Sequence, residues 1–567
     1  KAAGIDSRKD FHEGLVAAFP ALPIPKDIDG APAMVFDFWY DVTKDSFVPW
    51  SDAVPEYKHT PIGNGPGKQK YSEIMVQTAD SMRVAKLMNL LVRNSHNVML
   101  VGAAGTGKTA IVNNYLYHLA DEDESFLFNN INMNYYTDSK ALQVLLDQAI
   151  DKRSGRIYGP PTGKKMIFFV DDINLPYIEE YGTQNAMELL RQQIDHGSYF
   201  DREDLSLRKE LHDLQHVAAM NPLIGSFDIS ERNQRHYTTF ACVMPSETDL
   251  STIYEGILGG HFADFSGTVK SMAKVITAAT IHLHHEISHK FLPSAIKFVY
   301  NWNMRELSNI YQGLTLAGSD YYNTPMPIIR LWAHECCRVF ADRLVNLEEQ
   351  EKFTGIIKEV GKHFFGTKEH NFDQEAIFAE PNIHTKFEQA VTGPPQYLPI
   401  TSTESLSQCL DARLQEYNES FSIMDLVLFG DAMAHICRIA RIISNPSGNA
   451  MLIGVGGSGK QSLSRLASFI CGYEVKQLQV TSNFKVDDLK EALKEMYKLA
   501  GCKGIPITFL MTDTQIVNER FLVYINDMLS SGWIPDLFEK DEMDGLFGAI
   551  RNEAKAAGIA DTPTDML

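Results

Sequence analysis

Two stretches of this chain follow the same plan: an apolar strand, a glycine-rich loop that ends in Gly-Lys, and a helix. The first loop runs from Gly102 to Thr109 and the second from Gly454 to Gln461. Glycines let such a loop curl so that backbone amides at a helix N-terminus face a phosphate group. The two loops lie several hundred residues apart, and a repeat with so long a period is typical of whole modules in tandem rather than of a solenoid. The sequence therefore predicts an α/β protein with two phosphate-binding modules.

Size and charge limit the class of protein. The chain has 567 residues, 44% of them apolar, which is enough for about four compact units with sizeable cores. A net charge of −20 argues against a nucleic-acid partner, because binding to a phosphate backbone needs a basic surface. No apolar run is long enough to span a membrane.

Cysteine usage and the first residues indicate the compartment and context. The seven cysteines include no C-x-x-C pair, which favours a reducing, cytoplasmic environment. The start of the chain has neither an initiator Met nor the charge order of a signal peptide. We therefore expect a piece of a longer protein.

The first loop satisfies the full G-x-x-x-x-G-K-[ST] pattern. Lys108 is expected to reach the β- and γ-phosphates of a bound nucleotide, and Thr109 to offer its hydroxyl to Mg²⁺. A glycine-rich turn without a ligand is the alternative, but the strand Asn97–Val101 before the loop and the helix after it favour a nucleotide site. The predicted cradle comprises Gly102, Ala103, Ala104, Gly105, Thr106, Gly107, Lys108 and Thr109.

Polar residues follow two further strands of the first module. The strand Met166–Val170 ends in Asp171, the candidate Mg²⁺ ligand, and Asp172, at the water-activating position. Related ATPases usually carry Glu there, so the shorter Asp172 predicts imperfect attack geometry; a solvated acidic turn is the alternative. The strand Gln215–Met220 leads to Asn221, a candidate for holding the attacking water, although Asn before Pro is more often simply a turn.

The second loop keeps the cradle and departs at its last position. After the predicted strand Ala450–Ile453, Gln461 replaces the Ser or Thr whose hydroxyl contacts Mg²⁺. After a second strand, Ile507–Met511, Asp513 remains as a metal candidate, but Thr514 stands where the catalytic acid belongs and cannot act as a base at neutral pH. We therefore predict binding without hydrolysis. The predicted cradle comprises Gly454, Val455, Gly456, Gly457, Ser458, Gly459, Lys460, Gln461 and Ser462.

The segments around the first site resemble the third AAA+ module of an axonemal dynein heavy chain. The resemblance implies that Arg232 is an arginine finger toward the preceding module and that Arg305 stands at the sensor II position of a helical lid. An ordinary salt bridge within the lid is the alternative for Arg305. The segments that carry the resemblance are Val170–Pro176, Tyr181–Gly182, Glu188–Gln192, Arg232–Tyr237 and Phe291–Leu307.

The segments around the second site, Thr512–Val517 and Ile534–Phe538, resemble the fourth module of the same family. The implied fold is a tandem of P-loop AAA+ modules, each a parallel αβα sandwich with a helical lid subdomain. The replacement of the usual catalytic Glu by Asp172 and by Thr514 favours an axonemal over a cytoplasmic heavy chain. The expected divisions are an irregular segment over 1–67, a first large subdomain over 68–245, a lid over 246–400 and a second, truncated large subdomain over 401–567.

The resemblance implies an ATPase that couples nucleotide state to microtubule-based motility in the axoneme of a cilium or flagellum, part of the cytoskeleton. It implies ATP or ADP at two sites with Mg²⁺. It also implies weak ATP hydrolysis by these 567 residues on their own. The implied partners are the other AAA+ modules of the heavy chain and other dynein subunits. Microtubule contact would come only through a stalk outside these residues. The alternative is a regulatory scaffold that holds nucleotide without turnover.

A rival motif lies between the two sites. His285-Glu286-x-x-His289 matches H-E-x-x-H, which on a helix places two imidazoles on one face for Zn²⁺. Read alone, it predicts a metalloprotease. The extended ligand pattern fails at Leu292 and Ala295, so Glu306 would be needed as a third ligand. A chance match on an exposed lid helix is the alternative.

Overall fold

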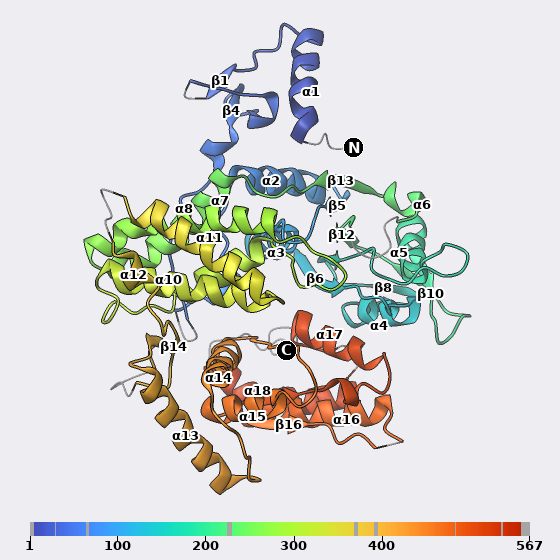
Figure 1. Ribbon diagram of the computed structural model, residues 1–567. Helices are drawn as coiled ribbons and strands as arrows, with labels where there is room; N and C mark the ends of the chain where they lie inside the picture. The colour runs from blue at the N-terminus through green and yellow to red at the C-terminus, as the bar shows by residue number, and fades with distance from the viewer. Residues whose placement is uncertain are drawn as a thin grey trace. The chain divides into compact units, whose positions relative to one another are not determined.

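The structure is a computed structural model, which describes residues 5–28, 30–63, 67–223, 229–367, 372–389, 395–481, 483–534 and 537–556. The chain divides into two compact units: Lys1–Thr60 with Ser72–Ile257, and Pro61–Tyr71 with Leu258–Leu567. Figure 1 labels their helices and strands along the chain. Pro535 and Asp536, which belong to the fourth-module resemblance, lie outside the described residues.

A five-stranded sheet of order β13-β5-β12-β9-β6 forms the centre of the first unit. Each neighbouring pair of strands is parallel. The strands predicted around the first site are confirmed to within one residue at each end. The strands are β5 (Asn97–Val101), β6 (Phe126–Asn132), β9 (Lys165–Asp171), β12 (Leu214–Met220) and β13 (Tyr237–Ala241).

Successive residues of the central strands contribute to two separate cores, because side chains alternate between the faces of a sheet. Met99 and Phe168 belong to the core that includes α4 and α5. Leu100 and Ile167 belong to the core that includes α2 and α3. The predicted parallel αβα sandwich is therefore confirmed in the first unit. Its helices are α2 (Ala79–Arg93), α3 (Lys108–Glu122), α4 (Ser139–Gln148) and α5 (Asn185–His196).

Smaller elements surround this sandwich. A second sheet of order β10-β11-β8-β7 lies within the first unit; its strands are β7 (Asp151–Ser154), β8 (Ile157–Gly159), β10 (Ser198–Phe200) and β11 (Arg208–Leu211). Within the segment 1–67, which was predicted to be irregular, the described chain from 20 to 67 forms only short elements, but a 14-residue helix precedes them. They are β1 (Asp27–Ile28), β2 (Ala31–Pro32), η1 (Val35–Asp37), β3 (Phe38–Asp41), β4 (Ser46–Pro49) and η2 (Trp50–Ala53). They follow the helix α1 (Ile5–Ala18).

The first part of the second unit is a bundle of long helices, which confirms that a helical lid lies within the range 246–400. The helix α9 begins after Asn303, whose side chain accepts a hydrogen bond from the Arg305 amide at 2.8 Å. The Glu306 carboxylate accepts one from the Asn303 amide at 2.8 Å, which completes a reciprocal cap. The bundle consists of α8 (Gly267–Lys290), α9 (Met304–Leu314), α10 (Pro325–Phe340) and α11 (Leu347–Phe365), after α7 (Glu247–His261).

The second part of this unit also has a glycine loop followed by a helix, but it has fewer strands than the first unit. The strands β16 (Glu474–Gln477) and β17 (Ile507–Leu510) pair in parallel. The helix α14 (Gly430–Ile443) precedes the second glycine loop. The other helices are α13 (Thr403–Ser420), α15 (Lys460–Ile470), α16 (Val486–Tyr497), α17 (Phe521–Ser531) and α18 (Lys540–Ala556). None of the described helices of the chain combines the length and apolarity that a membrane span needs.

The strand predicted over Ala450–Ile453 is wrong. These residues are in no strand, and Met451 and Ile453 are 82% and 65% exposed. In the first unit the corresponding strand, β5, pairs with β12 and β13, which both follow β9 along the chain. The described residues after β17 form helices and supply no such neighbours. An apolar segment becomes a strand only where another strand pairs with it.

Candidate nucleotide-binding sites

The first glycine loop adopts the backbone that its glycines permit. Gly105 and Gly107 have φ angles of +77° and +81°, in the left-handed region that favours glycine. Gly107 caps α3, which begins at Lys108. The first helical turn leaves unpaired amides at this end, so the loop and helix together present donors suited to phosphate oxygens.

Gly102 is required for a different reason. A Cβ atom at this position would lie 2.2 Å from the carbonyl oxygen of Cys242. Cys242 approaches because its amide donates to the Val101 carbonyl at 2.7 Å as β13 runs beside β5. The glycine pattern identified Gly102, but not this contact, which joins residues far apart in the sequence.

The predicted phosphate and metal ligands of the first site meet. The Lys108 ammonium is buried and donates to the carbonyl oxygens of Gly102 and Ala103, both at 2.8 Å. The Thr109 hydroxyl donates to the Asp171 carboxylate at 2.7 Å. A hydroxyl beside a carboxylate is an oxygen-only donor set, which suits Mg²⁺. The residues present therefore fit the metal that the motif implies.

The predicted water-activating residue has an unusual backbone. Asp172 follows the last residue of β9 with φ +51°, in the left-handed region that Asp adopts more readily than most residues. Its amide donates to the Asp171 side chain at 3.0 Å, and its carbonyl accepts from Leu175 at 3.0 Å. The chain thus turns sharply at Asp172, as in the acidic turn weighed as the alternative, although the left-handed backbone was not predicted.

Asn221 lies at the end of β12 and is buried. Its side-chain oxygen accepts from the Leu223 amide at 3.1 Å, which is the turn weighed as the alternative reading. Its backbone carbonyl accepts from the Asn174 side chain at 2.9 Å. The loop after β9 is therefore connected to the loop after β12. The role of Asn221 toward an attacking water stays a prediction.

The two arginines assigned from the resemblance are both exposed. Arg232 lies in α6 (Glu231–Gln234) of the first unit and forms no ion pair with the described residues. Its neighbour Arg235 does pair, with Asp195 at 2.8 Å. Arg305 lies in the first turn of α9 in the second unit and also has no ion pair among the described residues. An ordinary lid salt bridge, the alternative for Arg305, is thus not found among the residues that the structure describes.

The second glycine loop repeats the backbone of the first. Gly457 and Gly459 have φ angles of +79° and +74°. The Lys460 ammonium donates to the carbonyls of Gly454 and Val455 at 2.8 and 2.7 Å. These are the same contacts that Lys108 makes, so both loops hold their lysine in the same way.

The metal side of the second site differs from that of the first. Gln461 is exposed, and no hydrogen bond joins it to Asp513 within the described chain. Asp513 begins the short helix η7 (Asp513–Gln515). Thr514 lies 3.1 Å from Thr512, hydroxyl to hydroxyl. Ser462 follows one position later in α15. The hydroxyl–carboxylate pair of the first site therefore has no counterpart.

The H-E-x-x-H motif lies on the lid helix α8. His285 and His289 are exposed, with their Nε2 atoms 3.2 Å apart. Glu286 pairs with Lys290 at 2.7 Å, and this hydrogen bond lowers the pKa of the carboxyl group. The candidate third ligand, Glu306, caps α9 and pairs with Arg343 at 2.7 Å. Within the described ranges no group of three or more His, Cys, Asp or Glu side chains could hold a metal ion. The zinc alternative therefore lacks its third ligand.

Three families match the chain in succession. Residues 64–245 match the P-loop containing dynein motor region, residues 275–375 the AAA+ lid domain, and residues 424–567 the P-loop containing dynein motor region D4. The two glycine loops fall within the first and third matches.

Curated relatives align with nearly the whole chain. It is 44% identical to the dynein beta chain of the flagellar outer arm of Chlamydomonas reinhardtii. It is 42% identical to the ciliary dynein beta chain of Heliocidaris crassispina and 40% identical to dynein axonemal heavy chain 17 of Homo sapiens. Each alignment covers 98% of this chain and 12% of the relative.

Proposed function

Since this chain belongs to the axonemal dynein heavy-chain family, within its P-loop motor region, we propose that it forms the third AAA+ module and the first part of the fourth in a motor ring. The match of residues 424–567 to region D4 supports this numbering. The divisions at 67, 245 and 400 belong to the same proposal. The flagellar, ciliary and axonemal names of the relatives support an axonemal location.

The first site binds ATP and hydrolyses it. One observation carries this proposal: Thr109 and Asp171 are already joined by a 2.7 Å hydrogen bond at the mouth of a formed phosphate loop. Bound Mg²⁺ would neutralise charge on the phosphates there. Lys108 holds the phosphates, and Asp172 orients the attacking water with help from Asn221. Arg305 takes the sensor II position of the lid.

The second site binds nucleotide and does not hydrolyse it. Its loop and Lys460 match the first in backbone angles and lysine contacts, and those are the groups that binding needs. Gln461 lacks the hydroxyl for the metal, and Thr514 cannot serve as a base. Nucleotide there would be a structural or regulatory ligand.

Nucleotide state at these sites would drive motility through the rest of the molecule. The expected partners are the other modules of the same heavy chain and other dynein subunits, with microtubule contact through a stalk outside these residues. The exposed Arg232 would reach the nucleotide of the preceding module. Arginine fingers of this kind accelerate phosphoryl transfer by about 10³-fold or more.

A non-hydrolysing regulatory scaffold is the second candidate function. The observation in its favour is Asp172, whose side chain is one methylene shorter than Glu and whose backbone turns at φ +51°. Under this alternative both sites keep nucleotide without turnover. Hydrolysis at the first site separates the two candidates.

The test is a matched pair of variants, Lys108→Ala and Lys460→Ala, in an intact heavy chain whose remaining nucleotide sites are disabled. Lys108→Ala should empty the first site and abolish single-turnover hydrolysis. Lys460→Ala should empty the second site and leave hydrolysis in place. Equal, undiminished turnover by both variants would refute the assignment. Bound nucleotide at the first site of the parent protein without turnover would favour the scaffold.

A further inference from the structure

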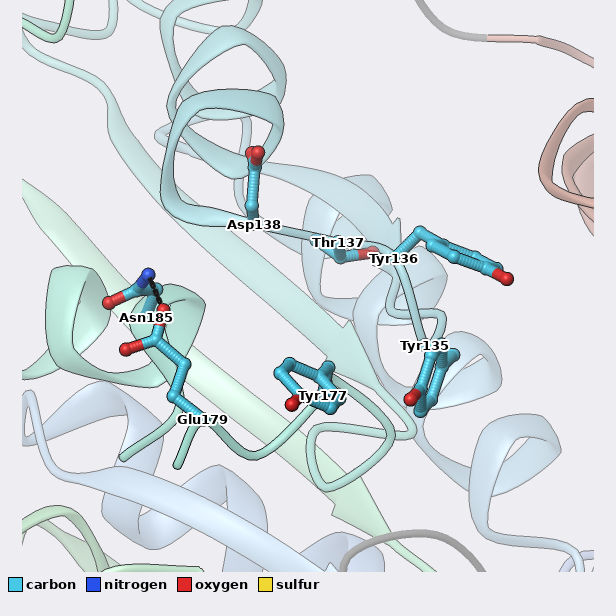
Figure 2. A pocket seen from close by; sticks show the side chains of 7 residues that line it. All are labelled: Tyr135, Tyr136, Thr137, Asp138, Tyr177, Glu179 and Asn185. Atoms are coloured by element: carbon cyan, nitrogen blue, oxygen red, sulfur yellow. Dashed lines mark hydrogen bonds between the residues drawn. The ribbon is translucent and has the colours of Figure 1, made fainter. Parts of the chain in front are cut away.

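A pocket of about 320 Å³ opens beside the first site, between the loop after β6 and the loop after β9. Figure 2 shows Tyr177 and Glu179 on one loop, with Tyr135 on the other and Asn185 at the start of α5. The Tyr177 amide donates to the Tyr135 carbonyl at 3.0 Å, so the two loops are fixed to one another. The pocket is thus formed before any ligand arrives.

Its aromatic walls are unusually open to solvent. Tyr135 and Tyr177 are 54% and 53% exposed, and their rings meet edge to face with centroids 5.5 Å apart. About half of each side chain is thus open to solvent, and the face of an aromatic ring attracts cations. Tyrosine is also enriched where proteins contact one another.

The pocket carries negative charge that no described cation neutralises. The Glu179 carboxylate accepts hydrogen bonds from Thr183 at 3.3 Å and from Asn185, and both donors are neutral. Its backbone is held in a turn, because its amide donates to the Thr183 carbonyl at 2.8 Å. Asp138 is a second acid on the pocket wall. Neither acid forms an ion pair with the described residues, and the nearby Lys140 pairs with Glu203 instead at 3.4 Å.

Tyrosine faces beside a fixed, unneutralised carboxylate form a receptor for a basic side chain. The same chain already uses this chemistry elsewhere, where the Lys86 ammonium lies 3.5 Å from the centroid of the Trp39 ring. A guanidinium suits the pocket better than an ammonium, because it is planar, stacks on rings and binds carboxylates through paired donors.

We propose that this pocket docks an arginine from a segment of the same heavy chain outside these 567 residues. The choice of partner rests on the proposed heavy-chain membership: this chain spans 12% of the relatives that it matches, and a tethered segment gains a high effective concentration. The docked segment would contact the loop that begins at Asp172, so it would couple to the nucleotide site.

The test places p-benzoylphenylalanine at position 177 of the intact heavy chain and irradiates it with ADP and, separately, with a non-hydrolysable ATP analogue. The matched control carries the same group at position 181, because Tyr181 is 88% exposed on the same loop and does not line the pocket. Position 177 should give an adduct with one segment of the same polypeptide in at least one nucleotide state. A yield no higher than at position 181 in both states, or an adduct with a separate subunit, overturns the proposal.

Charge reversal then identifies the contact. Glu179→Lys should lower the adduct yield about tenfold, whereas Glu180→Lys, at the exposed neighbouring acid, should not. Changing the docked arginine to Glu in the Glu179→Lys protein should restore the adduct. An unchanged yield in Glu179→Lys, or no arginine whose reversal restores it, refutes the docking site. Nucleotide occupancy of the first site, measured in the same samples, reports separately on the proposed function.

Discussion

The Thr109 hydroxyl donates to the Asp171 carboxylate at 2.7 Å, whereas Gln461 and Asp513, at the corresponding positions of the second module, share no hydrogen bond within the described chain. The two loops are otherwise alike in backbone angles and lysine contacts. The difference between the sites therefore lies on the metal side. Two predictions address it from opposite directions.

The first prediction removes the hydroxyl with Thr109→Val, which keeps the branched shape of the side chain. The affinity of the nucleotide-bound first site for Mg²⁺ should fall by about 10-fold or more, because Asp171 loses its partner and the metal loses a ligand. Titration of Mg²⁺ against bound fluorescent nucleotide measures this. Thr109→Ser is the control, since it keeps the hydroxyl and should behave like the parent protein. An unchanged titration for Thr109→Val would contradict the assignment.

The second prediction restores the missing groups with Gln461→Ser and Thr514→Glu together. Hydrolysis at the second site should become measurable only in the double variant, because the metal ligand and the base each contribute about 10² or more to rate. Single-turnover measurements in an intact heavy chain with the other sites disabled detect it. Prompt hydrolysis by the parent second site, or an empty second site at saturating ATP, would show that its assignment as a site that binds without hydrolysing is wrong.

The third prediction compares the same substitution at equivalent glycines in the 567-residue chain. Gly102→Ala should destabilise the first unit by about 1–3 kcal/mol, because its Cβ atom would lie 2.2 Å from a backbone carbonyl. Gly454→Ala should change stability by no more than about 0.5 kcal/mol, since its nearest contact is the Ser458 hydroxyl at 3.3 Å. Hydrogen exchange of the β5 and α15 amides distinguishes the two units. Equal loss of hydrogen-exchange protection in the two units, each measured in its own variant, would contradict the prediction.

The fourth prediction concerns acid sensitivity. Burial lowers the pKa of His216 from 6.5 to about 4, because the charged imidazolium is disfavoured in the core. Between these values the unfolded chain binds the proton and the folded chain does not. His216 therefore destabilises the first unit progressively as the pH falls from 6.5 toward 4, by on the order of 3 kcal/mol.

His216→Leu should flatten the dependence of unfolding free energy on pH across that window. Denaturant unfolding of the first unit at successive pH values measures the slope. His212→Leu, at an exposed histidine on the preceding loop, should keep the parent slope. Identical slopes for the parent and His216→Leu would show that His216 does not contribute to the loss of stability in acid.

The sequence alone was sufficient where the information is local. An apolar run and a glycine loop specify the bounds of β5 and a helix directly after the loop, because backbone angles and side-chain alternation depend on neighbours in the chain. The local patterns also named Thr109 and Asp171 separately as candidate Mg²⁺ ligands, and the sheet brings them together, since parallel strands bring their carboxyl ends to one edge.

Only the tertiary structure decided the features that depend on distant neighbours. The segment Ala450–Ile453 has the composition of a strand but pairs with none, since strand formation needs partners that the described residues do not supply. Cys242 makes Gly102 indispensable from more than a hundred residues away. Tyr135 and Glu179 form one pocket because two loops meet. Such contacts are set by how strands are ordered in the sheet, which no local pattern encodes.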